Sequence, residues 1–497
     1  MALTCPALEE VSQHLVTNSN PARDELEGMD SHRCAALHNA IYEHGWTSSF
    51  GDTTDFLANT ETWWGAFATP GFDTTNMHPT LEEFLKEARV LRDRQEQDKN
   101  FFYFMSGLSH SNMLDGRMDW FDIGRPKRLI TLYETYFSFA TKLDGLVYDQ
   151  LTHKAITHFD ITDDLKLEPE QPWQPLETIL TFWIDLIRRE KVIVLSPELA
   201  EPRIEWRPIP GTQSEGMQEL PQHHPVTGGV LKLDDHAPWV MQPWSQLDLA
   251  ETLSVWEMLV ELIEQKMEMP SKSESESMLT ADLLDAAGIP DGFARRFLSQ
   301  ARRPQFQYIA PGLEVPTCET FINQPARDEP RPYWIVPEKD MNYPEHVFPI
   351  LLFRHETASQ TSADPFQSPW TQHILGKGLV GLYLDACDRS NRVPYEDGFR
   401  LVLPFTFDRF GPGWATRSDG SQVIGYDELF QSGVNPLNDQ HPPKLVAFLA
   451  FVYHKVVGGV WRVDEHGVAG GIDVWTEANT EESWQEYWIP AEYIGLW

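Results

Sequence analysis

Apolar residues recur at helical spacing in several stretches of the chain. The clearest stretch is 80–94, where apolar positions follow one another at intervals of three and four. Such spacing predicts an amphipathic helix. Thr80 followed by Glu83 matches a capping box, which predicts that this helix begins at Thr80. The same reasoning predicts four more helices, at 31–46, 129–151, 176–189 and 246–267.

The pattern changes in the second half of the chain. Short apolar runs at 346–353 and 399–407 are rich in aromatic and branched residues and predict strands. Between the two patterns, Ser271–Ser277 contains no apolar residue, which is typical of a flexible linker or loop. We therefore predict an α+β protein with a helix-rich part at 1–269, a linker at 270–278 and a mixed sheet and helix part at 279–497.

Charge narrows the class of partner. The chain of 497 residues has 39 Lys and Arg against 75 Asp and Glu, a formal net charge of −36. This field repels nucleic-acid backbones and anionic lipid, and it attracts cationic ligands. The alternative is that the acidic excess only keeps the surface solvated.

Cysteines and apolar runs indicate the compartment. The four cysteines are far apart and form no CxxC pair, which fits unpaired thiols in a reducing compartment. The first residues lack the basic and apolar segments of a signal peptide. The longest apolar stretch, 445–453, has about half the length that a membrane span needs. We expect a soluble, cytoplasmic protein.

Two places combine histidine with carboxylates. His355 and Glu356 follow a predicted strand, and strand ends are rigid positions that suit acid–base groups. Asp464, Glu465 and His466 stand together in a glycine-rich turn. We predict that these five residues are catalytic.

The glycines after this turn allow two interpretations. A strand, a glycine loop and then a helix would point backbone N–H groups at an anion, with Gly467 and Gly470 as binding positions. The segment resembles the acyl-CoA loop of the N-acetyltransferase-like fold, except that Asp464 stands where that family has Arg or Gln. The alternative is a glycine-rich hairpin between two strands. A separate GxGxxG at 376–381 lacks the surrounding strand and helix of a dinucleotide site.

A run of aspartates follows a pair of histidines. Asp160, Asp163 and Asp164 come shortly after His153 and His158, and carboxylates in such a cluster could hold Mg²⁺. An acidic helix cap explains the run equally well. Because the spacing matches no readable metal pattern, we expect no metal and no cofactor, and we keep Asp160 and Asp163 as candidate substrate-binding residues.

Aromatic and basic clusters suggest two further kinds of contact. Among 18 tryptophans, the pair Trp63 and Trp64 could face a cationic ligand through their rings, although burial is the usual role of such residues. A basic and aromatic cluster could bind tRNA phosphates and bases; the alternative is that its arginines complement a helix C-terminus. Its arginines are Arg295, Arg296, Arg302 and Arg303.

These observations lead to one function hypothesis and two alternatives. The hypothesis is a metal-independent transferase of small-molecule or specialised metabolism that acts on an amine-bearing or cationic substrate by histidine and carboxylate acid–base chemistry. One alternative is an enzyme that forms peptide bonds from aminoacyl-tRNA, as cyclodipeptide-forming enzymes do. The other is a non-catalytic acidic protein that binds protein partners.

Overall fold

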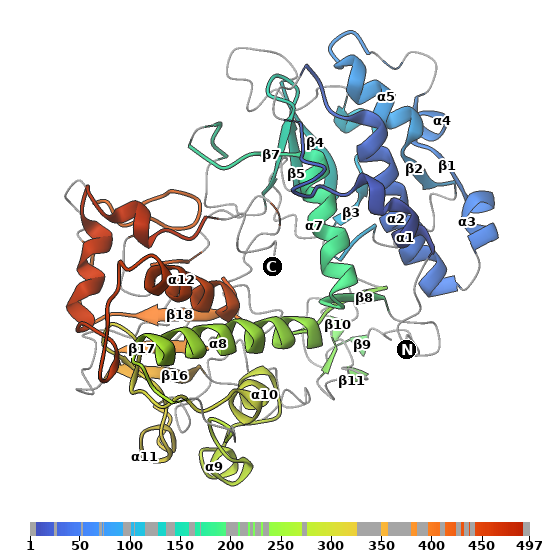
Figure 1. Cartoon of the computed structure of the whole chain (residues 1–497). Helices are drawn as coiled ribbons and strands as arrows, with labels where there is room; N and C mark the ends of the chain where they lie inside the picture. Colours follow the sequence, from blue (N-terminus) through green and yellow to red (C-terminus); the bar gives the residue numbers. More distant parts are fainter. Residues whose placement is uncertain are drawn as a thin grey trace. The chain divides into compact units, whose positions relative to one another are not determined.

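The computed structural model divides the chain into two compact units. The first is Met1–Met241 with Pro436–Asp439, and the second is Gln242–Asn435 with Gln440–Trp497. The structure describes residues 6–23, 27–50, 53–68, 72, 74–92, 101–103, 105–114, 128–135, 145–158, 165–168, 170–194, 207–208, 217–218, 222–223, 230–231, 238–270, 276–325, 349–355, 379–384, 396–407, 413–423, 429–431, 437 and 443–490. Both units mix helices and sheets, which confirms the predicted α+β class (Figure 1).

The longest helix of the first unit is α2. The helices of this unit are α1 (Pro6–Glu10), the 3₁₀ helix η1 (Val11–His14), α2 (Ser31–Phe50), α3 (Thr53–Asn59), α4 (Trp63–Phe67), α5 (Pro79–Glu87), α6 (Ser111–Leu114) and α7 (Leu176–Arg188). The predictions at 31–46 and 176–189 are confirmed by α2 and α7. The helix predicted at 80–94 is real but ends at Glu87. Its N-cap is His78 rather than Thr80, because the His78 ring accepts the hydrogen bond of the Thr80 N–H group.

The main sheet of this unit is antiparallel. It has the order β3-β4-β5-β6-β7, and smaller pairs join β1 to β2 and β8 to β13; β9 pairs with β10, and β11 with β12. The bounds are β1 (Thr60–Thr62), β2 (Arg89–Leu91), β3 (Met105–Leu108), β4 (Leu129–Thr135), β5 (Gly145–Asp149), β6 (Lys154–His158), β7 (Gln174–Pro175), β8 (Val192–Val194), β9 (Arg207–Pro208), β10 (Met217–Gln218), β11 (Gln222–His223), β12 (Val230–Leu231) and β13 (Trp239–Met241).

The helix predicted at 129–151 is wrong. That stretch contains β4 and β5, which pair with each other in an antiparallel register. Nearly all residues of both strands are buried, so the strands show no polar alternation that would distinguish them from a helix. Burial of both faces of β4 and β5 explains why this stretch forms strands without a polar alternation.

The second unit is built on a seven-stranded sheet. Its order is β18-β17-β16-β15-β14-β20-β19, with all pairs antiparallel except β14 and β20. The strands are β14 (Tyr308–Ala310), β15 (Leu313–Glu314), β16 (Ile350–His355), β17 (Gly381–Leu384), β18 (Phe399–Val402), β19 (Val463–Asp464) and β20 (Gly467–Val468). The strands predicted at 346–353 and 399–407 are confirmed by β16 and β18.

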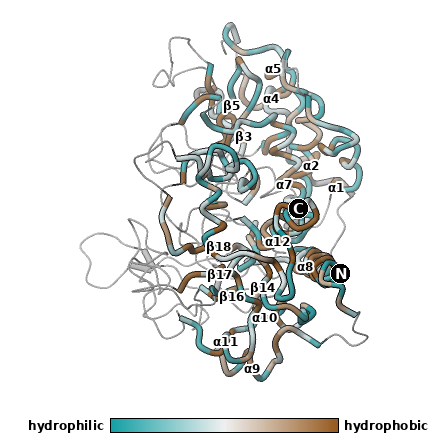
Figure 2. Tube along the Cα trace, turned by 60° about the vertical axis from the view of Figure 1, so that its left-hand side comes forward, coloured by the Kyte–Doolittle hydropathy of each residue, from teal (hydrophilic) through white to brown (hydrophobic). Residues whose placement is uncertain are grey.

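Two helices cover one face of this sheet. The helices of the unit are α8 (Gln246–Lys266), α9 (Ala281–Ala286), α10 (Phe293–Gln300), α11 (Cys318–Phe321), α12 (Leu445–Val457), and the 3₁₀ helices η4 (Ile472–Asn479) and η5 (Trp484–Tyr487). Trp256 of α8 stacks on Phe353, and Phe448 of α12 contacts Phe399. The strand register places Phe353 and Phe399 on the same face (Figure 1). Figure 2 shows hydrophobic positions recurring along α8, α12 and β17.

The helix predicted at 246–267 is confirmed by α8, which belongs to the second unit. The division between the units falls after Met241, whereas the sequence pattern suggested a division after 269. Residues 271–275 of the predicted linker lie outside the described residues. At its far end, Ser277 pairs with Arg302 and the next residue, Met278, is buried. Within the described part of the chain, no helix is both long and apolar enough to cross a membrane.

Candidate functional site

His355 is the last residue of β16 and lies almost wholly inside the second unit. Its Nδ1 atom is 3.1 Å from the carbonyl oxygen of Gly312. A carbonyl oxygen only accepts, so Nδ1 carries the proton in this bond. In the neutral ring the lone pair is then on Nε2, which is the arrangement that a general base needs.

The main chain around Gly312 fixes this orientation. Gly312 has φ +68°, and a Cβ atom there would come within 2.5 Å of the Ile472 backbone nitrogen. The Gly312 N–H group donates to the carbonyl of Gly470 at 3.1 Å. Trp475 donates its indole N–H to Pro311 at 2.9 Å. The turn at Gly312, whose carbonyl accepts the His355 hydrogen bond, is therefore fixed by contacts with η4 and with Gly470.

Asp464, Glu465 and His466 form a tight hairpin turn between β19 and β20. The hairpin pairs Asp464 with Gly467, and Asp464 accepts a hydrogen bond from the His466 backbone at 2.8 Å. The side chains of Glu465 and His466 are 87% and 63% exposed and lie 4.0 Å apart. Both groups face water, where the Glu465 carboxylate can attract a cation, but they are poorly placed for chemistry that excludes water.

The glycine-loop interpretation of this segment is wrong. The apolar run before the hairpin is the helix α12, the two-residue strand β19 leads into the turn, and Gly467 lies in β20. Gly467 has φ +116°, and a Cβ atom there would meet the Tyr308 carbonyl oxygen at 2.5 Å, so this glycine allows β20 to approach β14 closely, as the alternative hairpin interpretation predicts. Gly470 has φ +107° and lies beside the Val474 side chain, just before η4.

His355 and the Asp464–His466 hairpin belong to the same sheet but are not on neighbouring strands. His355 pairs with Leu313 of β15, β15 pairs with β14, and β14 pairs with β20. Three strand spacings of about 4.8 Å separate β16 from β20, so the two turns lie ~14 Å apart. They cannot exchange a proton directly. Glu356, the predicted partner of His355, lies outside the described residues.

The tryptophan pair has a structural role in the first unit. Trp63 is completely buried and donates its indole N–H to the Ser109 carbonyl at 2.8 Å. The Trp64 ring is covered by the Lys86 ammonium, 4.9 Å from its centroid. In this structure Trp63 cannot reach a substrate, and the face of Trp64 that Lys86 covers already holds a cation.

The basic cluster is neutralised by carboxylates. Arg295 pairs with Asp285 at 2.6 Å, and Arg296 pairs with Asp291 at 2.9 Å. Arg302 binds two glutamates, Glu257 at 2.7 Å and Glu264 at 2.8 Å. These partners occupy the guanidinium groups that tRNA phosphates would need. Arg295 and Arg296 lie in the first half of α10, so the predicted role at a helix C-terminus does not apply to them.

Arg303 follows Arg302, and its backbone N–H donates to the carbonyl of Glu276. Asp160 and Asp163 lie outside the described residues, as do the first glycines of the GxGxxG segment. Within the residues that are described, no group of three His, Cys, Asp or Glu side chains could hold a metal ion.

A buried ion pair in the second unit was not foreseen. Lys444 lies before α12, and its ammonium contacts Asp248 in the first turn of α8 at 2.8 Å, with both side chains about 95% buried or more. The second Asp248 oxygen accepts from Ser245, the N-cap of α8, at 2.8 Å. The Ser-x-x-Asp spacing is a helix-start signal, but its partner stands 196 residues away, which no local pattern shows.

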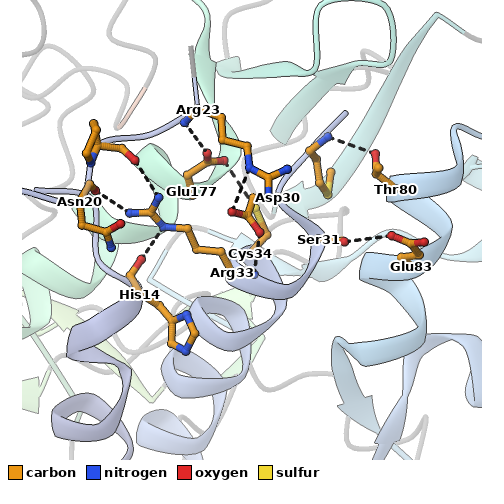
Figure 3. Close-up of polar contacts among 12 residues, drawn as sticks. His14, Asn20, Arg23, Asp30, Ser31, Arg33, Cys34, Thr80, Glu83 and Glu177 are labelled. Carbon is orange, nitrogen blue, oxygen red and sulfur yellow. Dashed lines mark hydrogen bonds and ion pairs between the residues drawn. The ribbon is translucent and has the colours of Figure 1, made fainter. Parts of the chain in front are cut away.

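A second polar cluster joins the N-terminal segment to α2 and α7 (Figure 3). The guanidinium of Arg33 donates to four backbone carbonyls, those of His14, Leu15, Asn20 and Pro21. The buried Glu177 of α7 accepts from the Arg23 backbone at 3.3 Å and from the Cys34 thiol at 3.7 Å. Burial and the nearby Glu177 raise the pKa of Cys34, so this thiol stays protonated. The cluster ties segments together and holds no reactive thiolate.

The aromatic core near the C-terminus encloses a cation of its own. The Lys455 ammonium lies 4.7 Å from the Tyr487 ring centroid and 5.4 Å from that of Phe451. It also contacts Glu486 at 2.9 Å. Burial lowers the pKa of Lys455, and the Glu486 carboxylate opposes that effect. The Lys455 ammonium is thus stabilised by two aromatic rings and one carboxylate.

Comparison of the chain with family models, with curated proteins and with solved structures finds no match.

Proposed function

We propose that the second unit carries an acid–base site for an amine-bearing, cationic small molecule, with His355 as the base. The observation that carries the proposal is the hydrogen bond from Nδ1 to Gly312, which leaves the lone pair on Nε2. A strand end that is fixed by backbone contacts on both sides suits such a base, because its position does not depend on mobile side chains.

The chemistry that fits this base is group transfer to nitrogen. An ammonium group is not a nucleophile until it loses a proton. In the proposed step Nε2 of His355 takes that proton, the N–H bond breaks, and the freed lone pair attacks an electrophilic donor whose leaving group departs. The Glu465 carboxylate of the hairpin, ~14 Å away on the same sheet, contributes attraction and not proton transfer.

Charge supports a cationic substrate over an anionic one. The net charge of −36 favours cations over the whole surface. The pairing of Arg295, Arg296 and Arg302 with carboxylates argues against the tRNA-dependent alternative. Among the residues that the structure describes, no specific contact favours the protein-interaction alternative.

Histidine labelling tests the proposal. Diethylpyrocarbonate modifies neutral imidazole, and peptide mass spectrometry can follow each histidine separately. We expect agmatine, an arginine-like amine, to slow the labelling of His355 while the exposed His454 reacts at an unchanged rate. Equal rates at His355 with and without a panel of amines, or protection by AMP instead, would contradict the proposal.

A further inference from the structure

Helix α5 of the first unit is capped by a histidine. Nδ1 of His78 lies 2.8 Å from the Thr80 hydroxyl and accepts the Thr80 backbone N–H at 3.4 Å. An N–H group only donates, so Nδ1 must keep its lone pair, and a protonated imidazole has none. The cap therefore requires a neutral His78. A charged ring would also place a cation at a helix N-terminus, where the helix dipole disfavours it.

A second histidine packs against the cap. The His153 ring lies 4.4 Å from the His78 ring, centroid to centroid, and its Nδ1 is 3.1 Å from the Tyr148 hydroxyl. His153 ends the turn between β5 and β6 with φ +58°, a left-handed conformation that few residues other than glycine adopt. Burial lowers the pKa of His153, and the neighbouring His78 lowers it further.

The same turn is fastened to the start of α5 by a glutamine. Gln150 accepts a hydrogen bond from the His78 backbone N–H at 2.8 Å and donates one to the Asn76 carbonyl at 3.2 Å. The contacts between the β5–β6 turn and α5 therefore converge on His78.

The charged groups on β5 and in the first turn of α5 have partners of their own. Asp149, which precedes the turn, is held by two hydrogen bonds from Arg128. Glu82 pairs with Lys86, and Glu83 accepts a hydrogen bond from the Ser31 hydroxyl. Asp149 raises the pKa of His153, but less than burial and His78 lower it.

We propose that His78 and His153 form an acid-sensitive latch that holds the β5–β6 turn on α5 at neutral pH and releases it on mild acidification. His153 binds a proton less readily in the folded chain than in the unfolded chain. Its contribution to stability is therefore present above pH 6.5, the ordinary histidine value, and is lost as pH falls below it. Loss of the cap at His78 acts in the same direction.

Hydrogen exchange of the full chain tests the latch. Pulses at a series of pH values, corrected for the intrinsic exchange rate, are compared for peptides covering 78–88 and 145–158. We expect the wild type to lose protection there by about fivefold to tenfold on mild acidification, the size expected for losing a helix cap. Peptides from α8 in the second unit serve as the internal reference.

Two variants decide the outcome. His78→Asn keeps an N-cap acceptor that does not titrate, and His153→Asn tolerates the left-handed backbone, so both should flatten the pH dependence. His78→Asp provides a second cap if the first variant folds poorly. His454→Asn, at an exposed position of the second unit, should behave as the wild type. The same pH dependence in the wild type and in the His78 variants would overturn the proposal, as would unchanged protection of the wild type.

Discussion

Lys444 and Asp248 show what one residue contributes when its charge is buried. Their side chains meet at 2.8 Å with almost no exposure, so each charge compensates the other where water has little access. An exposed pair such as Lys154 and Glu168, at 2.7 Å, is compensated by water as well. The two pairs have similar geometry and should differ greatly in the free energy of unfolding that they control.

Lys444→Met should therefore destabilise the chain by about 3–5 kcal/mol, because it leaves the Asp248 carboxylate buried without its cation. Lys154→Met, the matched control, should cost less than ~1 kcal/mol. The double variant Lys444→Met with Asp248→Asn should recover part of the loss. Denaturant unfolding measures all three. Equal effects at the two lysines would show that burial gives the Lys444–Asp248 pair no larger role in stability than an exposed pair has.

His38 makes the first unit sensitive to acid at the scale of a single residue. It is buried, its Nε2 donates to the Arg89 carbonyl at 2.9 Å, and its Nδ1 accepts from the Tyr133 hydroxyl at 2.9 Å. Burial lowers its pKa to about 4 from 6.5, and the Arg89 carbonyl bond opposes that effect.

A depressed histidine pKa means that the unfolded chain binds the proton first. The stability linked to His38 is therefore complete above pH 6.5 and falls as pH drops toward about 4, by roughly 3 kcal/mol in all. His38→Gln, which cannot titrate, should flatten the pH dependence of the unfolding free energy in that range. A slope that stays as steep in the variant would assign the acid loss to other groups.

At the element scale, two glycines of the first sheet provide a matched pair. Gly107 of β3 and Gly145 of β5 both pair with Glu134 of β4, and both have positive φ, +154° and +126°. A Cβ atom at Gly107 meets nothing within 4 Å, whereas one at Gly145 would overlap the Tyr133 carbonyl oxygen. The backbone strain is similar, but the steric cost is not.

Gly107→Ala should cost about 1 kcal/mol, and Gly145→Ala should cost roughly 3 kcal/mol because the β4–β5 pairing must shift as well. Thermal unfolding with a near-ultraviolet signal from the tyrosines measures both. If the two variants lose the same stability, the close approach of β5 to β4 does not limit this sheet.

The same hairpin shows how far sequence patterns reach. Apolar periodicity correctly predicted α2, α7 and α8, although α7 is buried along nearly its whole length. It failed at 129–151, where strands buried on both faces show no alternation. Asp144-Gly145 is a turn dipeptide inside the predicted helix, and it was the available signal for a hairpin.

The candidate site was predictable to a similar extent. His355 was predictable because a histidine at the end of an apolar run is a local pattern. Its hydrogen bond to Gly312, 43 residues earlier, depends on sheet register, which no local pattern specifies. The same limit explains why the sequence could not show that two strands stand between His355 and the hairpin of Asp464 and His466.

At the scale of the whole molecule, net charge is the feature that bears on substrate binding. A net charge of −36 over 497 residues attracts cations at long range, and salt screens that attraction. A histidine supplies no negative charge, so a site built on His355 needs this field to bind a cationic amine. Binding of an amine should therefore depend on both the field and the histidine.

The most direct test is a thermal-shift panel on the full chain. Agmatine, spermidine and tyramine, with AMP and acetyl-CoA as anionic comparisons, are measured at low and high salt on the wild type and on His355→Asn. We predict that the amines raise the melting temperature, that salt weakens this effect, and that the variant shows less of it. Stabilisation by the anionic compounds alone, or amine stabilisation that is equal in the variant, would contradict the account.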